Sequence, residues 1–112
     1  MRIISQPITL HDLNAMLPGY FGNMVKAVVD VDLGHIGLNA ELQADIESAM
    51  LEQGSALSNL WGINLYPSDN EVEVEYDSLI NIRPHQGNCS RDVQNPIIRE
   101  RIIDLVNNLI VI

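Results

Sequence analysis

Residues 24–38 read MVKAVVDVDLGHIGL, and their periodicity predicts the centre of the fold. Within residues 24–33 every second position, from Val25 to Leu33, is apolar, and the many valines are typical of a strand with one apolar face. The glycine turn DLGH follows, and a second alternating run covers residues 36–44. Together the two runs predict an antiparallel hairpin. Beyond Ala44 the helix-forming composition and an apolar stripe predict that the chain becomes helical.

Boundary signals place helices at three points in the chain. Thr9 and Asp12 have the spacing of a capping box, so we expect a short helix that ends at the following Pro-Gly pair. Gly54 stands where the helix beyond Ala44 needs a C-terminal cap. Asn95 is a good N-cap and Pro96 fits the first helical position, so a terminal helix is expected to begin there.

Two further alternating runs, residues 59–67 and 71–82, predict a second pair of strands. The sequence therefore predicts a single domain over residues 1–112 with an α+β fold. We expect a two-layer sandwich in which a four-stranded, mainly antiparallel sheet carries helices on one face. In the last run the residues expected to face inward are Val72, Val74, Tyr76, Ser78, Ile80 and Ile82, and those expected to face outward are Glu71, Glu73, Glu75 and Asp77.

Composition limits the classes of function. A chain of 112 residues that is 46% hydrophobic suits one soluble globular core. A net charge of −9 argues against nucleic-acid binding, which needs clustered cations. The apolar runs are short or interrupted by charges, so we expect no membrane span and no leader. The lone Cys89 cannot form an internal disulfide, which favours a cytoplasmic protein.

Charge is distributed unevenly along the chain. Residues 1–82 carry a net charge of −10, whereas residues 83–112 carry +1 because four of the six cations lie there. An irregular segment of about twelve residues separates the last expected strand from the last helix, which is long for a connection in a small domain. The four cations in this part of the chain are Arg83, Arg91, Arg99 and Arg101.

These arginines have two competing explanations. They can pair internally with the outward acids of residues 71–77, which repel one another on one strand face. Alternatively, the loop 83–95 can bind an anion, because arginine offers paired donors and a Gly-Asn-Xaa-Ser segment offers backbone N–H groups. We favour internal pairing, and we expect Arg101 and Asp104 to form a helix-surface pair. The candidate ligand-binding residues of the second explanation are Arg83, Asn88, Ser90 and Arg91.

Other constellations predict no catalytic residue, no metal site and no cofactor. His85 and Cys89 offer two soft ligands where structural zinc needs four. A lone Cys89 beside Arg91 is also a weak candidate for a nucleophile. The remaining set of titratable residues lies on the polar face of the first hairpin, where a solvent-facing sheet surface explains it. That set is Asp30, Asp32, His35 and Glu41.

The terminal helix has a broader apolar side than one sheet face covers, because Ile97, Ile103 and Ile110 widen it. The leading hypothesis is therefore a noncatalytic interaction domain that self-associates as a homo-oligomer, such as a dimer. The alternative is an enzyme or sensor for a small anionic ligand that uses the loop 83–95, and enzymatic activity is left open. The acidic surface also suggests a basic protein as a partner.

Several segments resemble a family of small uncharacterised bacterial proteins, a domain of unknown function. The resemblance spans residues 23–110 and implies a small bacterial cytosolic protein without an assigned activity or cofactor. His85 and Cys89 stand where other residue types are usual in that family. The segments that carry the resemblance are MVKAVVDVD (24–32), EQGS (52–55), LWGINLYP (60–67), SLINIRP (78–84) and IRERIIDLVNNLI (98–110), with the pattern INIRPxxGNxSR at 80–91.

Overall fold

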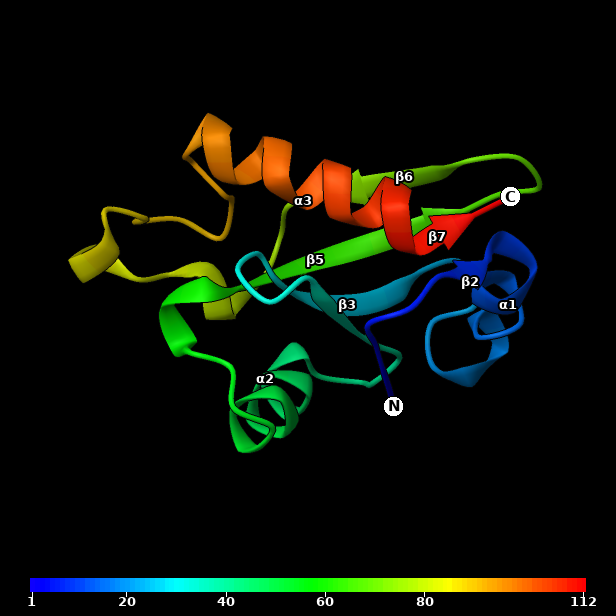
Figure 1. The fold of residues 1–112 in the computed structure, drawn as a ribbon, viewed down its shortest axis with the longest axis horizontal. Coiled ribbons are helices and arrows are strands. Elements are labelled where there is room, and N and C mark those ends of the chain that lie inside the picture. The colour runs from blue at the N-terminus through cyan, green and yellow to red at the C-terminus, as the bar shows by residue number, and fades with distance from the viewer.

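The computed structural model describes residues 1–112 and confirms an α+β fold built on an antiparallel sheet (Figure 1). The sheet has five strands in the order β1-β4-β3-β5-β6, with the hairpins β3–β4 and β5–β6 joined through the pairing of β3 with β5. Its strands are β1 (Arg2–Ile4), β4 (His35–Leu38), β3 (Val25–Asp30), β5 (Leu60–Pro67) and β6 (Val72–Glu75).

Three α-helices and a small second sheet complete the fold. The second sheet pairs β2 (Ile8–Thr9) in parallel with β7 (Ile110–Val111), and it lies at the end of the molecule that holds the C-terminus (Figure 1). None of the helices has the length and apolar character needed to cross a bilayer. The helices are α1 (Leu10–Asn14), α2 (Gln43–Glu52) and α3 (Pro96–Leu109), and short 3-10 turns occupy Leu17–Gly19, Leu57–Asn59, Leu79–Asn81 and Pro84–Gln86.

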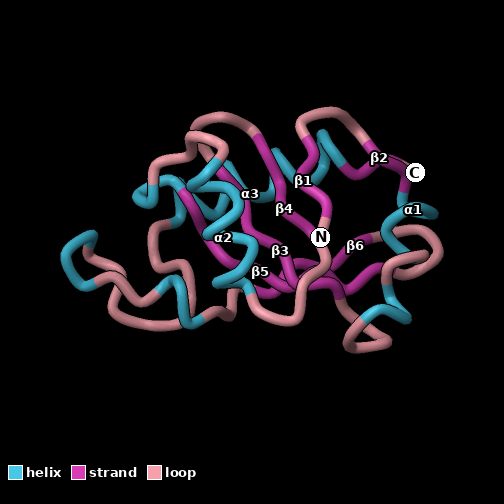
Figure 2. Tube along the Cα trace, turned by 90° about the horizontal axis from the view of Figure 1, so that it is seen from below, coloured by secondary structure: helices cyan, strands magenta, loops and turns pink.

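Helices cover both faces of the main sheet, which corrects the prediction of one covered face. Figure 1 shows α3 on one side of the sheet and α2 on the other, and Figure 2 shows α2 from its own side. The α3 side holds the larger apolar core, which includes the predicted inward face of β5 at Trp61, Ile63 and Leu65. The α2 side has a smaller core of its own, formed by Val28, Ala40, Ile46, Met50 and Leu60.

A row of two glycines and a valine explains how α2 packs so closely. Val28 of β3 lies opposite Gly37 of β4 and Gly62 of β5. A Cβ atom at Gly37 would lie 2.2 Å from the Ile46 side chain, and one at Gly62 would lie 2.5 Å from Ser78. The missing side chains therefore leave the space in which α2 and the segment after β6 rest on the sheet.

Several element boundaries differ from the sequence prediction. The run 36–44 ends as a strand at Leu38 because Asn39 adopts a left-handed conformation with φ 68°, and α2 already begins at Gln43. The strands β1, β2 and β7 were not predicted. The run 71–82 is strand only to Glu75, so Ile82 is 43% exposed instead of facing inward.

The predicted signals at the beginnings of α1 and α3 and after α2 are confirmed. The predicted end of the first helix is wrong, because α1 ends at Asn14 and the Pro-Gly pair lies in the separate 3-10 turn Leu17–Gly19. Thr9 and Asp12 form a reciprocal capping box at α1, with both hydrogen bonds at 3.1 Å. Asn95 caps α3 by accepting a hydrogen bond from the Ile97 N–H at 2.9 Å, and Pro96 is the first helical residue. Gly54 follows α2 with a positive φ of 104°, as a glycine beyond a helix C-terminus often does.

Candidate functional site

Arg83, the first candidate of the loop, is buried and spends its donors on the protein itself. Its side chain is 5% exposed, and its Nε donates a hydrogen bond of 3.0 Å to a backbone carbonyl oxygen. The two terminal nitrogens donate to three further acceptors. All four acceptors belong to neighbouring turns and to β5: the carbonyl oxygens of Ile80, Leu57 and Leu60 and the side-chain oxygen of Gln86.

The surroundings of the Arg83 guanidinium are apolar on one side and acidic on the other. The guanidinium carbon lies 4.8 Å from the centroid of the Trp61 ring, and the nearest carboxylate oxygen, of Glu47 in α2, is 3.9 Å away. Burial lowers the pKa of Arg83, and the Glu47 charge partly offsets this. Burial also raises the pKa of Glu47, against the pull of Arg83. Arg83 thus connects α2, β5 and the loop 83–95.

Asn88, the second candidate, is buried inside the loop and hydrogen-bonds to its backbone. It is 3% exposed, and its amide nitrogen donates to three backbone carbonyl oxygens while its amide oxygen accepts from the Gln94 N–H. Its backbone is paired in both directions with the backbone of Arg83. The carbonyl acceptors of its amide are those of Asn81, Ser90 and Asp92.

The outer arginines differ in their partners. Arg91 donates from Nε to Asp77 at the end of the acidic run, and Arg99 pairs with Asp92 while its guanidinium lies 4.4 Å from the Tyr76 ring centroid. Arg101 has no carboxylate within 4.0 Å, so the predicted pair with Asp104 is not formed. Internal pairing therefore involves Asp77, Asp92 and Glu47, and not the ladder at Glu71 and Glu73.

In the polar set of the first hairpin, Asp32 and Glu41 are exposed as predicted and His35 is half-buried, but Asp30 departs from the prediction. Asp30 is fully buried because its carboxylate caps the turn after β3, accepting from the N–H groups of Asp32 and Leu33. Its second oxygen accepts from the Ser55 hydroxyl at 2.6 Å. Asp30 thus holds the turn and the segment after α2 together. No three His, Cys, Asp or Glu side chains gather closely enough to hold a metal ion.

A buried polar network under α2 was missed by sequence reasoning. Gln43 donates to the Ile63 carbonyl oxygen and to the Asn64 side chain, each at 3.0 Å, and its own amide oxygen accepts from the Ser78 hydroxyl at 2.9 Å. Asn64 in turn donates to the Glu75 carboxylate at 2.8 Å. The available signal was an asparagine within the otherwise apolar run of β5.

The network continues to the edge of the sheet through Tyr66, whose hydroxyl donates to Glu75 at 3.2 Å. Burial and the Glu75 charge raise the pKa of the Tyr66 hydroxyl. Lys26, Asn64 and Glu75 stand side by side on adjacent strands, because Lys26 lies opposite Asn64 and Asn64 opposite Glu75. The α2 face of the sheet thus carries a polar row across three strands.

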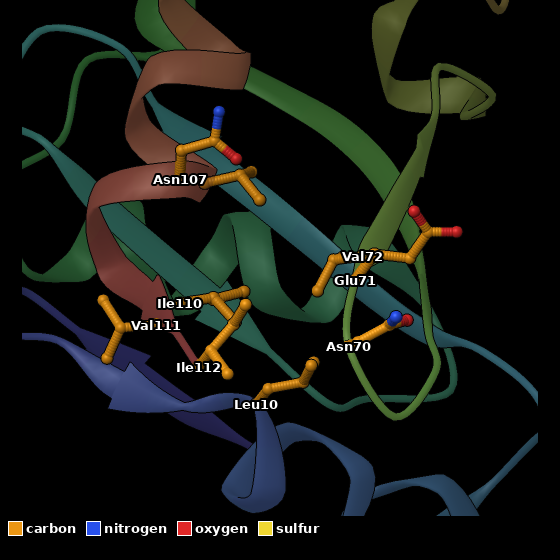
Figure 3. Close-up of a pocket in the computed structure, with 9 residues that line it drawn as sticks. Leu10, Asn70, Glu71, Val72, Asn107, Ile110, Val111 and Ile112 are labelled. Atoms are coloured by element: carbon orange, nitrogen blue, oxygen red, sulfur yellow. The ribbon is translucent and has the colours of Figure 1, made fainter.

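An apolar groove of about 460 Å³ lies at the other end of the molecule, where β7 follows α3. Figure 3 shows the side chains that line it, with Ile110 and Ile112 on one side, Val72 on the other and Leu10 below them in this view. The Glu71 carboxylate points away from them. Ile112 is 91% exposed at this groove, whereas Ile110 is buried. Of the three isoleucines expected to widen the apolar side, only Ile97 and Ile103 are exposed.

The chain belongs to a family of proteins of unknown function, DUF5674, whose family model matches residues 2–109. No curated protein and no solved structure matches the chain. The family assignment carries no activity, ligand or residue role, so a function has to be argued from the groove, the loop and the polar network themselves.

Proposed function

We propose that this protein is a noncatalytic interaction domain that self-associates through the groove beside β7. The supporting observation is the exposure of Ile112, at 91%, next to an apolar groove of about 460 Å³. A protruding apolar side chain beside an apolar groove is self-complementary, because in a two-fold dimer each copy can place its Ile112 in the groove of the other. Burial of this surface would remove from water the large apolar side chain with the highest exposed fraction.

The charge around the groove also favours a second copy as the occupant. Two chains with a net charge of −9 repel one another, so they can meet only where charge is sparse. Glu71 is the single charged residue among the nine that line the groove, and the other polar ones are Asn70 and Asn107. The repulsion between two copies is therefore weak at this surface.

Sheet edges are less suited to self-association than the groove. The edge strand β6 presents Glu73 and Glu75, and pairing two such edges would bring like charges together. The opposite edge strand, β1, is only three residues long. Short or charged edges are typical of sheets that avoid edge-to-edge pairing.

A matched pair of variants tests the proposal by light scattering coupled to gel filtration. Ile112→Asp places a charge in the contact without touching the core, so we expect it to shift the protein from dimer to monomer. Leu33→Asp is the control, because Leu33 is also exposed, at 50%, but lies in the turn between β3 and β4. Equal masses for wild type and Ile112→Asp would contradict the proposal, as would an equal loss of mass in both variants.

The second candidate function is recognition of a small anionic ligand, for which the sequence pointed to Arg83, Asn88, Ser90 and Arg91. One observation favours it: the two terminal nitrogens of Arg91 have no hydrogen-bond partner, and its side chain is 53% exposed. Arg83 and Asn88 already use their donors within the loop, so they support the position of Arg91 instead of offering free donors. Binding by the loop itself stays a prediction.

A further inference from the structure

A cavity of about 250 Å³ lies on the α2 side of the sheet, between the beginning of α2, strand β3 and the segment after β6. Lys26 and Arg91 are among the eight residues that line it, and none of the eight is acidic. The whole chain has 15 acids and 6 cations. The cavity thus has two of the six cations and no acid in its lining, although the Asp77 carboxylate is paired with Arg91. Its lining is less acidic than the surrounding protein.

Lys26, the second residue of β3, lines this cavity. It faces the same side of the sheet as Val28 and is half-buried. Its ammonium group has no carboxylate within 4.0 Å and lies 5.0 Å from the centroid of the Phe21 ring. The Lys26 ammonium is therefore a positive charge without an ion-pair partner in the protein.

Arg91 enters the cavity from the loop and is held at two places. Its backbone carbonyl oxygen accepts from the Ser78 N–H at 3.0 Å and from the Asn81 amide at 3.0 Å. Its Nε is bound by the Asp77 carboxylate, which leaves both terminal nitrogens free. A guanidinium anchored in this way presents a preoriented pair of donors.

The beginning of α2 adds backbone donors to the same cavity. Leu42, the N-cap residue, provides no side-chain cap, whereas α1 and α3 are capped by Thr9 and Asn95. The N–H groups of Gln43 and Ala44, which also line the cavity, have no acceptor within the protein. Uncapped N–H groups at the positive end of a helix favour an anion, and here they add to the two side-chain cations.

From these four contributions we propose that the cavity binds a compact oxyanion with the dimensions of a phosphate group, either free or as a phosphomonoester. Arg91 would bind two oxygens through its terminal nitrogens, and Lys26 would neutralise charge from the sheet side. The tetrahedral group has enough oxygens left for the N–H groups of α2, which a carboxylate with two oxygens lacks. A volume of about 250 Å³ is below the range of sites that enclose whole nucleotides or drug-sized molecules.

The site is independent of the proposed self-association. The groove beside β7 and the cavity at Lys26 are lined by different residues, and they lie on opposite sides of the main sheet. Loss of the dimer in the Ile112→Asp variant should therefore leave anion binding intact, and loss of anion binding should leave the dimer intact.

Titration of the whole protein with inorganic phosphate, followed by backbone amide NMR, tests the proposal. We expect saturable shifts centred on Gln43, Ala44 and Arg91, with methyl phosphate giving the same pattern if an ester is accepted. Arg91→Met and Lys26→Met should each weaken the apparent affinity by about tenfold or more. Arg101→Met is the matched control, since Arg101 is an exposed arginine without an ion pair, and it should bind phosphate as the wild type does.

Three results would overturn the proposal. The first is the absence of saturable shifts with either phosphate or methyl phosphate. The second is binding of succinate, a dicarboxylate of similar charge, with a higher affinity than either phosphate ligand. The third is an equal loss of affinity in Arg91→Met and in the Arg101→Met control, which would mean that only net charge matters. Arg91 is exposed at its side chain, so its replacement does not open the core, and the amide spectrum itself reports whether each variant is folded.

Discussion

The Arg83 guanidinium carbon lies 4.8 Å from the centre of the Trp61 ring, so a buried cation rests against the one tryptophan of the sheet. Because the same guanidinium donates to turns before and after it in sequence, Arg83 fixes the loop in place. The arginine that stands out most in the sequence is thus a structural residue, and Arg91, which the loop positions, retains free donors.

Arg83→Lys should destabilise the fold although it keeps the positive charge. A lysine ammonium cannot reach three carbonyl oxygens and a side-chain oxygen in the geometry of a guanidinium fork, so buried acceptors lose their partners. We expect a loss of about 2–4 kcal/mol in the free energy of unfolding, measured by urea denaturation. Arg101→Lys, at an exposed position without an ion pair, should change it by less than about 0.5 kcal/mol. Similar small effects at both positions would show that Arg83 is not structural.

Gly37→Ala should be among the most damaging small substitutions on the α2 side. The new Cβ would lie 2.2 Å from the Ile46 side chain and 3.1 Å from the Met50 sulfur, both of which are buried. We expect a loss on the order of 2 kcal/mol in thermal or urea unfolding. In a double-mutant cycle, Ile46→Ala should relieve part of the strain, with a coupling energy of about 1 kcal/mol.

The control for this steric effect is Gly19→Ala, where the nearest atom is the Asn39 side-chain oxygen at 3.3 Å and can move. Its effect on the free energy of unfolding should be much smaller. Additive losses for Gly37→Ala and Ile46→Ala would contradict the close approach of α2 to the sheet.

The pH dependence of the free energy of unfolding should show whether burial or the attraction of Arg83 dominates the pKa of Glu47. Burial raises the pKa of Glu47 above its ordinary value, so the folded state binds this proton more tightly than the unfolded chain does. The contribution of Glu47 to the free energy of unfolding is therefore greatest at low pH, and it declines as the pH rises through the pKa of Glu47 in the folded state. Glu47→Gln removes the decline, so its stability relative to wild type should increase between about pH 4 and 7.

Urea midpoints of both proteins across this range measure the difference, and Glu100→Gln on the exposed side of α3 serves as the control. A relative loss of stability in Glu47→Gln with rising pH would mean that the attraction of Arg83 at 3.9 Å outweighs the burial of the carboxylate.

Local signals in the sequence predicted local structure well. The capping box at Thr9, the cap at Asn95 and the alternation around Val28 and Trp61 each depend on neighbouring residues only, and the structure confirms them. The end of β4 was misjudged because alternation continued past Asn39, whose left-handed backbone turns the chain regardless of pattern. A three-residue strand such as β1 is too short to show a period.

The site was harder to predict because polar residues at alternating strand positions suggest an exposed face, whereas here some of them are buried. Asp30 and Asn64 occupy strand positions that alternate as an exposed face would, yet α2 and the segment after β6 cover them. The cover depends on Gly37 of β4 and Gly62 of β5 lying on either side of Val28 of β3, a relation that only the strand register defines. Lys26 likewise becomes part of a cation-lined cavity only once Arg91, distant in sequence, folds back beside it.

Sedimentation velocity over a concentration series tests the central claim of self-association most directly. The weight-average mass should rise from the monomer value of 12.5 kDa toward twice that value between about 1 and 200 μM. The rise should begin at lower protein concentration in about 0.5 M salt, because salt screens the repulsion between chains of net charge −9 while apolar contacts persist. A mass of 12.5 kDa at every concentration in both salts would contradict the account.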